Sequence, residues 1–269
     1  MNFYTTIMGS GAAVPTLTRH CSGQVVNVGG YRLLLDCGEG TQHQIRAYRQ
    51  KLQSIQLICI SHLHGDHFFG LPGLLATLHL CGRTLPITVI APQGARQALD
   101  VLLSASSTQL AYELRIIELS HSDKQLVFTS PRCQISAFPI WHSVPTYGYI
   151  IEEVPRSQSR PRRMAYCCDT GFHEELAGYV RDVDLLCMES TFADDMASVA
   201  EEKQHLTASQ AALIAHKAGV GQLLLTHFSA RYRELDPLYQ QASVIFPDVV
   251  LAEDGMVVPI GYSKAPAHV

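Results

Sequence analysis

The sequence predicts an α/β fold, because short apolar runs alternate with segments of helical periodicity along most of the chain. The run from Leu57 to Ile60 is continuously apolar, as in a strand that is buried on both faces. Segment 73–82 (GLLATLHLCG) then has helical spacing and ends on Gly82. The composition, 47% hydrophobic and 16% charged, is typical of a globular α/β protein.

The same alternation continues along the chain. Segment 24–38 (QVVNVGGYRLLLDCG) predicts a hairpin that turns at Gly29 and Gly30. Segment 85–92 predicts a strand, 94–106 a helix, and 133–153 two strands interrupted at Pro145. Further strands are predicted within 163–171, 184–191, 222–229 and 248–260, with a helix at 207–220 that Thr207 can cap. We find no internal repeat, and therefore expect one domain over residues 1–269 with a basic loop at 152–163.

Composition also narrows the class of protein. The net charge of −4 gives no overall attraction to nucleic acid, so such binding would require a local basic patch. Residues 1–14 lack a charged n-region and a long apolar h-region, so we expect no signal peptide. We also expect no membrane span, since no apolar stretch reaches about 18 residues. The eight cysteines lack zinc-ribbon or disulfide-scaffold spacing, which favours buried thiols in a reducing cytoplasm.

The most informative segment directly follows an apolar strand. Residues 61–70 (SHLHGDHFFG) place three histidines and an aspartate within six positions. In an extended chain His62 and His64 point the same way and can reach one cation. Asp66 and His67 follow a tight turn at Gly65 and can reach a second cation a few Å away. A histidine-rich surface turn is the alternative, and the density of donors favours a metal site.

Three more ligand-type residues stand where other apolar strands end. His142 follows ISAFPIW, Asp169 follows MAYCC, and His227 follows QLLLT. Taken singly, a histidine beside Trp141 is as readily a core or rim residue, and an aspartate before Thr-Gly is often only a turn residue. Taken together, the three residues complete a set of ligands for two metal ions.

These motifs resemble the metallo-β-lactamase superfamily and, within it, ribonuclease Z, the tRNA 3′-processing endonuclease. The resemblance rests on SHLHGDHFFGLPGLL, CDTG and THFSARY, with GSGAAVPTLTR, LLLDCGEGTQHQI, ESTF and LAEDGM in support. It spans nearly the whole chain, with the motifs in the family's order. It implies a four-layer αβ/βα sandwich, in which two mixed β-sheets lie face to face with helices outside.

The resemblance also implies a ligand set. One zinc ion would be held by His62, His64 and His142, and the other by Asp66, His67 and His227. Asp169 would bridge the two ions. Imidazole and carboxylate donors without a thiolate suit hydrolytic zinc, and manganese is a possible replacement. Two such ions can activate a hydroxide for attack on a phosphodiester, with Asp66 as the family's base.

Cleavage also requires a proton for the departing 3′ oxygen. His205 corresponds to the histidine that the family uses for this step, and Glu189 of MEST is expected to orient it. Without the family context, a histidine before a helix is more often a cap or surface residue. Glu189 could equally pair only with a backbone amide. With these residues the enzyme would leave 3′-hydroxyl and 5′-phosphate ends.

One departure from ribonuclease Z concerns how the substrate is held. Family members of the common type carry a long arm that grips tRNA, whereas here only residues 143–168 separate His142 from Asp169. Loop 152–163 instead holds four arginines that could bind phosphates, although a solvated loop is the alternative. They are Arg156, Arg160, Arg162 and Arg163.

The expected function is therefore zinc-dependent removal of 3′ trailers from precursor tRNA by a cytoplasmic homodimer. The alternative is a metal-dependent hydrolase of a small phosphodiester, thioester or lactone with no role in tRNA processing. A binding module that has lost its metals is a third class, against which the seven intact ligand residues argue. The arginine-rich loop is the feature that separates the nuclease from the small-molecule hydrolase.

Overall fold

The computed structural model describes residues 3–155 and 159–262, which divide into two compact units. Within these limits, the N-terminal unit comprises residues 3–120 and 253–257, and the C-terminal unit comprises 121–252 and 258–262. Each unit is built on a mixed β-sheet with helices beside it, and each is described by itself. The alternation of strands and helices predicted from the sequence is present in both units.

The sheet of the N-terminal unit has an antiparallel and a parallel half. Six of its strands, in hydrogen-bonded order, are β1 (Phe3–Gly9), β3 (Gly23–Val28), β4 (Tyr31–Leu35), β5 (Ile55–Cys59), β6 (Ile87–Pro92) and β7 (Leu114–Leu119). The pairs β1–β3 and β3–β4 are antiparallel, and the strands from β4 to β7 are parallel. The predicted hairpin is confirmed: Gly29 and Gly30 turn between β3 and β4 with φ of 58° and 94°, which glycine adopts without a side-chain clash.

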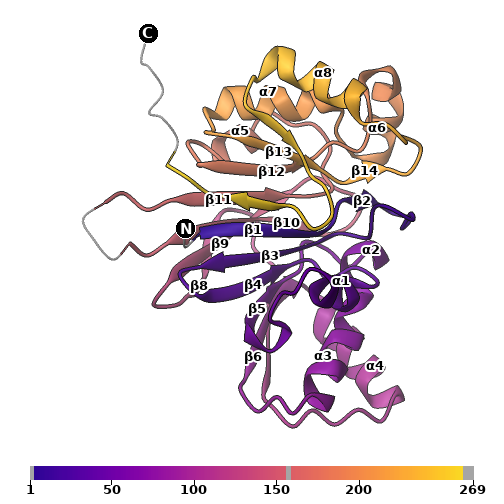
Figure 1. Ribbon diagram of the computed structural model, residues 1–269, viewed down its shortest axis with the longest axis vertical. Coiled ribbons are helices and arrows are strands. Elements are labelled where there is room, and N and C mark those ends of the chain that lie inside the picture. Colours follow the sequence, from indigo (N-terminus) through magenta and orange to yellow (C-terminus); the bar gives the residue numbers. More distant parts are fainter. Residues whose placement is uncertain (1–2, 156–158, 263–269) are drawn as a thin grey trace. The chain divides into compact units, whose positions relative to one another are not determined.

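Helices of this unit pack against the sheet and one another. They are α1 (Thr41–Ala47), η1 (Leu52–Ser54), α2 (Gly65–Phe68), α3 (Gly70–Leu80) and α4 (Ala95–Ala105), and a short strand β2 (Gly11–Ala12) follows β1. Helix α3 contacts both α1 and α4 (Figure 1). Its buried leucines, Leu71, Leu74, Leu75 and Leu78, join a core that includes Ile58 and Val89. The predicted helix at 73–82 is confirmed, and it begins earlier, at Gly70.

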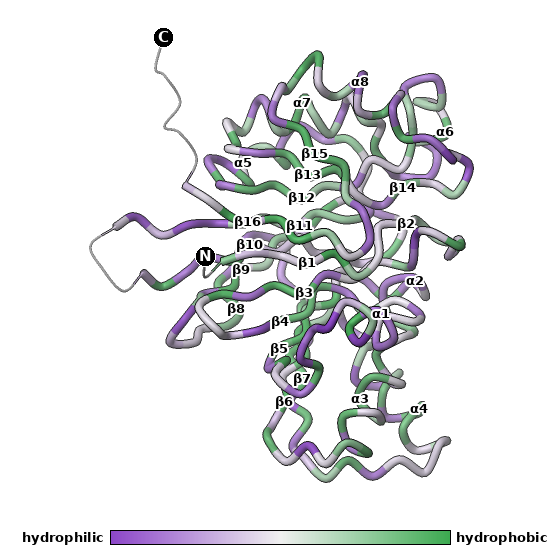
Figure 2. The backbone as a smooth tube through the Cα atoms, viewed as in Figure 1, coloured by the Kyte–Doolittle hydropathy of each residue, from purple (hydrophilic) through white to green (hydrophobic). Residues whose placement is uncertain are grey.

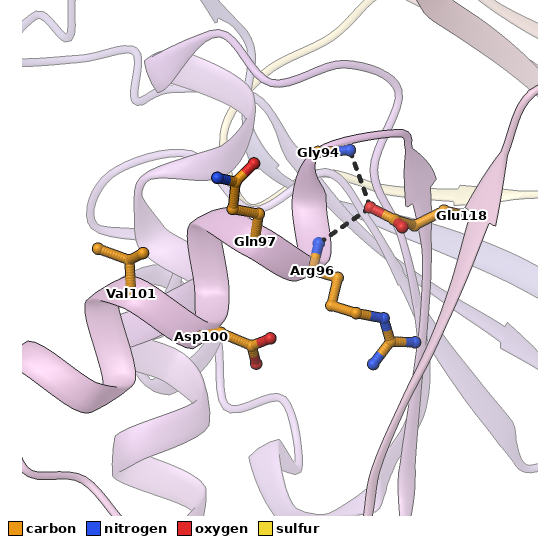
Figure 3. A pocket seen from close by; sticks show the side chains of 6 residues that line it. All are labelled: Gly94, Arg96, Gln97, Asp100, Val101 and Glu118. Carbon is orange, nitrogen blue, oxygen red and sulfur yellow. Dashed lines mark hydrogen bonds between the residues drawn. The ribbon is translucent and has the colours of Figure 1, made fainter.

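The start of α4 is capped from a neighbouring strand. Glu118 on β7 accepts hydrogen bonds from the backbone N–H groups of Gly94 (2.8 Å) and Arg96 (3.1 Å), as Figure 3 shows. These are amides that a helix leaves without an intrahelical acceptor, and a carboxylate there also faces the positive end of the helix dipole. The shallow pocket around these amides therefore already contains an anionic group, the carboxylate of Glu118.

The sheet of the C-terminal unit is also mixed. Its hydrogen-bonded order is β15 (Val249–Leu251), β13 (Leu223–Thr226), β12 (Leu185–Glu189), β11 (Arg163–Cys167), β10 (Thr146–Glu153), β9 (Cys133–Ile140) and β8 (Gln125–Thr129). Strands β11, β12, β13 and β15 are parallel, and β8 to β11 are antiparallel neighbours. Because β9 and β11 both run opposite to β10, the strands β9, β11, β12 and β13 all end at one edge. Apolar residues dominate these strands (Figure 2).

Helices α7 and α8 lie side by side and contact the parallel strands (Figure 1). The helices of this unit are α5 (Leu176–Tyr179), η2 (Asp194–Met196), α6 (Ala197–Lys203), α7 (Ala208–Ala218) and α8 (Asp236–Ile245), and β14 (Phe228–Ser229) is a further short strand. Thr207 caps α7 as predicted: its side chain accepts from Gln210 N–H, and the Gln210 side chain accepts from Thr207 N–H.

Three details differ from the sequence-based expectation. Strand β10 continues through Glu153 and β11 begins at Arg163, so the loop between them spans 154–162 rather than 152–163. Segment 248–260 forms two short strands, β15 and β16 (Val257–Pro259), because Asp254 and Gly255 form a turn between them. Gly65 opens the short helix α2 instead of a simple turn, so Asp66 and His67 lie on a helix.

Candidate metal centre

The histidine motif of the N-terminal unit brings ligand atoms close together. His62 Nε2 and His64 Nδ1 lie 3.1 Å apart, and Asp66 Oδ2 and His67 Nε2 lie 3.2 Å apart. Two atoms bound at about 2.0–2.1 Å to one zinc ion with tetrahedral geometry would be about 3.3 Å apart. Each pair therefore has the separation of two ligands on a single ion, and the pairs are those that the sequence suggested.

A buried carboxylate orients the last of these histidines. Asp36 follows β4, and its Oδ2 accepts from His67 Nδ1 at 2.7 Å. Ser61, which follows the adjacent strand β5, donates its N–H to Asp36 Oδ1 (2.6 Å) and its hydroxyl to Oδ2 (2.8 Å). Because the proton of His67 is on Nδ1, its Nε2 is the nitrogen available to a metal. Ser61 Oγ also lies 3.0 Å from His62 Nδ1, which extends the network to a second predicted ligand.

Sequence reasoning assigns no role to Asp36 or Ser61. Both carry the signal that identifies the other residues, a polar side chain just after a buried parallel strand. In the sequence, Asp36 stands out only as part of the motif LLLDCGEGTQHQI. Asp66 also accepts a hydrogen bond from the main chain, because Ala13 donates its N–H to Asp66 Oδ2 at 2.8 Å.

In the C-terminal unit, the predicted ligands meet at the common strand edge. His142 follows β9, Asp169 follows β11 and His227 follows β13. His227 Nε2 is 3.1 Å from Asp169 Oδ1, and His142 Nε2 is 3.7 Å from Asp169 Oδ2. Each carboxylate oxygen of Asp169 thus faces a different histidine, which is the arrangement expected of a carboxylate shared by two ions.

Hydrogen bonds on the far side of each ring fix these two histidines. His142 Nδ1 donates to the Gln204 carbonyl (3.1 Å), and His227 Nδ1 contacts Thr191 Oγ1 (2.9 Å). Burial lowers the pKa of His142, and the nearby charge of Asp169 opposes this in part. The neutral imidazole that results is the form that binds metal. Thr191 is a further residue whose role sequence reasoning does not predict.

Glu189 is the centre of a buried hydrogen-bond network at the end of β12. Its Oε1 accepts from His205 Nδ1 (2.7 Å) and Thr170 N–H (2.8 Å). Its Oε2 accepts from Thr191 Oγ1 (2.6 Å) and N–H (3.2 Å), and from Leu206 N–H (3.1 Å). Burial alone would raise the pKa of Glu189, but the charge and hydrogen bond of His205 hold the pKa below its usual value. An ionised Glu189 only accepts hydrogen bonds, so the His205 proton at this contact is on Nδ1.

His205 lies near both histidines that are metal-ligand candidates in its unit. Its ring centroid is 5.2 Å from that of His142 and 5.6 Å from that of His227, and 15% of its side chain is exposed. Glu189, His205 and His227 also offer ligand atoms within 4.8 Å of one another, so this trio could itself hold a cation. If Glu189 orients His205 as predicted, the two side chains must be in contact, and they are. Their catalytic roles stay predictions.

Three residues of these networks have backbone conformations that usually favour glycine. Asp36, Asp169 and His227 have φ of 55°, 34° and 60°. A positive φ is uncommon for residues with a side chain, and such conformations concentrate at functional sites.

The arginines of the basic loop are largely engaged within their own unit. Arg160 forms a bidentate ion pair with Asp184 (2.5 and 3.1 Å), and Arg162 forms one with Glu153 (both 2.7 Å). Arg163 donates to two backbone carbonyl groups, and Arg156 lies outside the described residues. The loop therefore offers less unpaired positive charge than its sequence suggests, and its predicted contact with RNA stays a prediction.

Comparison with known proteins places the chain in a family. Residues 31–228 match the model of the beta-lactamase superfamily domain. Ribonuclease Z of Parabacteroides distasonis is 35% identical over 298 residues, which cover 95% of this chain and 98% of that protein. Ribonuclease Z of Methanosarcina mazei is 33% identical over 299 residues, covering 95% and 97%. The crystal structure of the short form of human tRNase Z is 32% identical, with a TM-score of 0.81 and coverage of 96% of this chain and 99% of that one.

A metallo-β-lactamase fold with histidine and carboxylate donors at its strand ends defines a metal-dependent hydrolase, and the predicted αβ/βα fold class is confirmed. Within that superfamily, the chain belongs to the ribonuclease Z family and is a metal-dependent endoribonuclease of that type. In the described part of the chain, no helix is both long and apolar enough to cross a membrane.

Proposed function

We propose that the protein is a zinc-dependent ribonuclease Z that removes 3′ trailers from precursor tRNA. The observation that carries the proposal is the spacing of donor atoms: in each unit, pairs of histidine and aspartate atoms lie about as far apart as two ligands on one ion. The donors are imidazoles and carboxylates, which suit zinc, with manganese as a possible substitute. The relatives named above are ribonuclease Z and tRNase Z proteins.

We assign the ligands as the family resemblance suggests, and propose that the two units act as one domain. His62, His64 and His142 would hold one ion, and Asp66, His67 and His227 the other. Asp169 would bridge the two ions. When bound, two divalent cations would supply Lewis-acid stabilisation of the charge that develops on the phosphate.

The other steps are proton transfers by the chain itself. Asp66 orients the attacking water and accepts its proton, and the Ala13 N–H group fixes the Asp66 carboxylate. His205 Nδ1 is bonded to Glu189, so the proton on the other ring nitrogen, Nε2, is the one that His205 gives to the departing 3′ oxygen. Glu189 keeps the ring in this orientation and stabilises its charged form. The products are a 3′-hydroxyl and a 5′-phosphate.

We also propose that the loop arginines contact tRNA phosphates. Of Arg160 and Arg162, Arg160 is the stronger candidate, since 46% of its side chain is exposed against 16% for Arg162. Alanine at Arg156, Arg160, Arg162 and Arg163 should lower the log–log salt slope of binding by about 0.7–0.9 for each phosphate that is no longer neutralised. Lys124→Ala, which removes an exposed cation of the same unit, is the matched control.

The proposed setting is a homodimer in the cytoplasm, which the family resemblance and the free cysteines support. The deciding experiment incubates the purified protein with end-labelled precursor tRNA and, separately, with bis(p-nitrophenyl) phosphate, alongside metal analysis. We expect close to two zinc ions per chain and a single cut that releases the trailer. Hydrolysis of the small diester without cleavage of tRNA would instead favour a small-molecule phosphodiesterase.

A further inference from the structure

A cavity of about 400 Å³ opens beside His205 in the C-terminal unit. Its volume lies within the range of small-ligand pockets, about 300–1,000 Å³. Two aromatic side chains line it, Trp141 after β9 and Phe172 after β11. Polar groups come from the helices, Glu201 on α6 and Gln210 on α7. This combination of flat apolar walls and a few polar groups is suited to a planar heterocycle.

The indole of Trp141 is held as a fixed wall of this cavity. Gly171 donates its N–H to the Trp141 carbonyl at 2.7 Å. A Cβ atom at Gly171 would lie 2.9 Å from Trp141 Cε3, so the six-membered ring of the indole packs against the bare backbone of that glycine. Even so, 50% of Trp141 is exposed. A large apolar surface that is ordered but not buried is typical of a binding site.

The polar groups add hydrogen-bonding capacity at defined positions. Gln210 accepts from Thr207 N–H through Oε1 (2.9 Å), which fixes the amide so that its NH₂ group is the end left to donate to a ligand. Glu201 supplies a carboxylate acceptor on the exposed face of α6. A donor and an acceptor beside aromatic surfaces match the edges of a nucleobase. The pocket at the start of α4 lacks these features, because it has no aromatic residue in its lining and its amides are capped by Glu118.

The position of His205 indicates which nucleotide of the substrate the cavity would bind. In the proposed reaction, His205 protonates the 3′ oxygen that leaves, and that oxygen belongs to the nucleotide on the 5′ side of the cut. The ribose and base of the same nucleotide must therefore lie next to His205, which forms one wall of the cavity. We propose that the cavity binds the unpaired base on the 5′ side of the cleaved bond, stacked on Trp141 and Phe172. This inference rests on the proposed function.

Fluorescence tests the proposal directly, because Trp141 is the single tryptophan of the chain. The probe is a short oligoribonucleotide with a 3′-hydroxyl end, titrated into the zinc-loaded protein. Its control is the same oligonucleotide with an abasic residue at the 3′ end. Base–aromatic stacking contributes about 1–3 kcal/mol, so we expect saturable quenching and a dissociation constant about 5–150 times larger for the abasic probe. Equal dissociation constants for the two probes would overturn the proposal.

A matched pair of variants gives a second readout while Trp141 stays in place. Phe172→Ala should weaken binding of the intact probe by about fivefold or more and reduce the difference between the two probes. Tyr239→Ala removes an aromatic ring of similar exposure (42%) from α8, outside the cavity, and should leave both titrations unchanged. If the two variants behave alike, Phe172 does not contact the base. The comparison of probes on the unaltered chain is unaffected by any folding defect of a variant.

Failure of this inference can be distinguished from failure of the proposed function. Precursor tRNA that is cut normally, with no base-dependent quenching, would refute the base pocket and leave the nuclease. Base-dependent quenching by a protein that does not cut precursor tRNA would support the pocket and refute the assigned reaction.

Discussion

Replacing Asp36 by asparagine tests how one buried carboxylate supports metal binding. Asp36 is fully buried and accepts from His67 Nδ1 (2.7 Å) and from the amide and hydroxyl of Ser61. Asparagine has nearly the same shape and tolerates the positive φ of 55° at this position better than most residues. The substitution therefore changes the hydrogen-bonding groups while disturbing the backbone little.

The structure allows the asparagine amide two orientations, and each has a cost. If its oxygen keeps the bond to Ser61 N–H, its NH₂ group faces His67 Nδ1. His67 must then move its proton to Nε2, the nitrogen proposed to bind metal. If the oxygen faces His67 instead, the NH₂ group meets Ser61 N–H across 2.6 Å, and two buried donors oppose each other at a cost of about 1–3 kcal/mol. The first orientation protonates the proposed ligand atom of His67, and the second destabilises the hydrogen-bond network that holds His67 in place.

We expect the affinity for one of the two ions to fall by about 10–100-fold, which is the usual effect of removing such an outer partner. This corresponds to about 1.4–2.7 kcal/mol. Competition with a chromophoric zinc chelator measures both affinities, and Asp100→Asn, on the exposed face of α4, is the control. Affinities equal to those of the unaltered protein, in a variant that folds normally, would refute the role given to Asp36.

Other predictions concern the C-terminal unit. Asp169→Ala should remove both zinc ions, whereas His227→Ala should chiefly empty one site; equal metal contents in the two variants would contradict the bridging role. His205→Ala should keep its metal and slow cleavage of precursor tRNA by about 10²–10⁴-fold, with a smaller loss for a p-nitrophenyl ester, whose leaving group needs little protonation. Equal losses on both substrates would make His205 structural. Arg160→Ala should lower the free energy of unfolding by about 1–3 kcal/mol, because buried Asp184 loses two charged hydrogen bonds; urea denaturation checks this, and an unchanged midpoint would show that the pair is not stabilising.

Sequence reasoning finds those parts of the candidate site whose residues lie close together in the sequence. The motif from His62 to His67 is compact, so the pairing of its donors follows from local geometry, and the structure places the two atoms of each pair 3.1 or 3.2 Å apart. That these pairs bind metal stays a prediction. Asp36 contacts His67 across 31 positions, and only the parallel pairing of β4 with β5 brings the two together. No local pattern reveals such a contact, which is why sequence reasoning does not find Asp36.

The basic loop shows the opposite limit, because its local pattern of charge does not reveal the ion pairs that its arginines form with distant residues. Four arginines in a short segment indicate a phosphate-binding surface when only their own charges are considered. Asp184 is 24 positions from Arg160 and Glu153 is 9 positions from Arg162, and both ion pairs depend on the arrangement of strands β10 to β12. Likewise, the cavity at Trp141 depends on Gly171, which the sequence presents only as part of a turn.

Asp36, Asp169 and His227 have a left-handed backbone conformation that is unfavourable for the stability of the fold. The same three side chains serve the proposed metal centre. Such conformations cost about 1–3 kcal/mol each, and the surrounding structure must outweigh that cost. Sequences selected for thermal stability alone would readily accept glycine at these positions. They would then lose two proposed metal ligands, Asp169 and His227, and the carboxylate of Asp36 that orients a third. A programme to stabilise this enzyme should therefore exclude these three positions from its library, however favourable a substitution there looks in a melting assay.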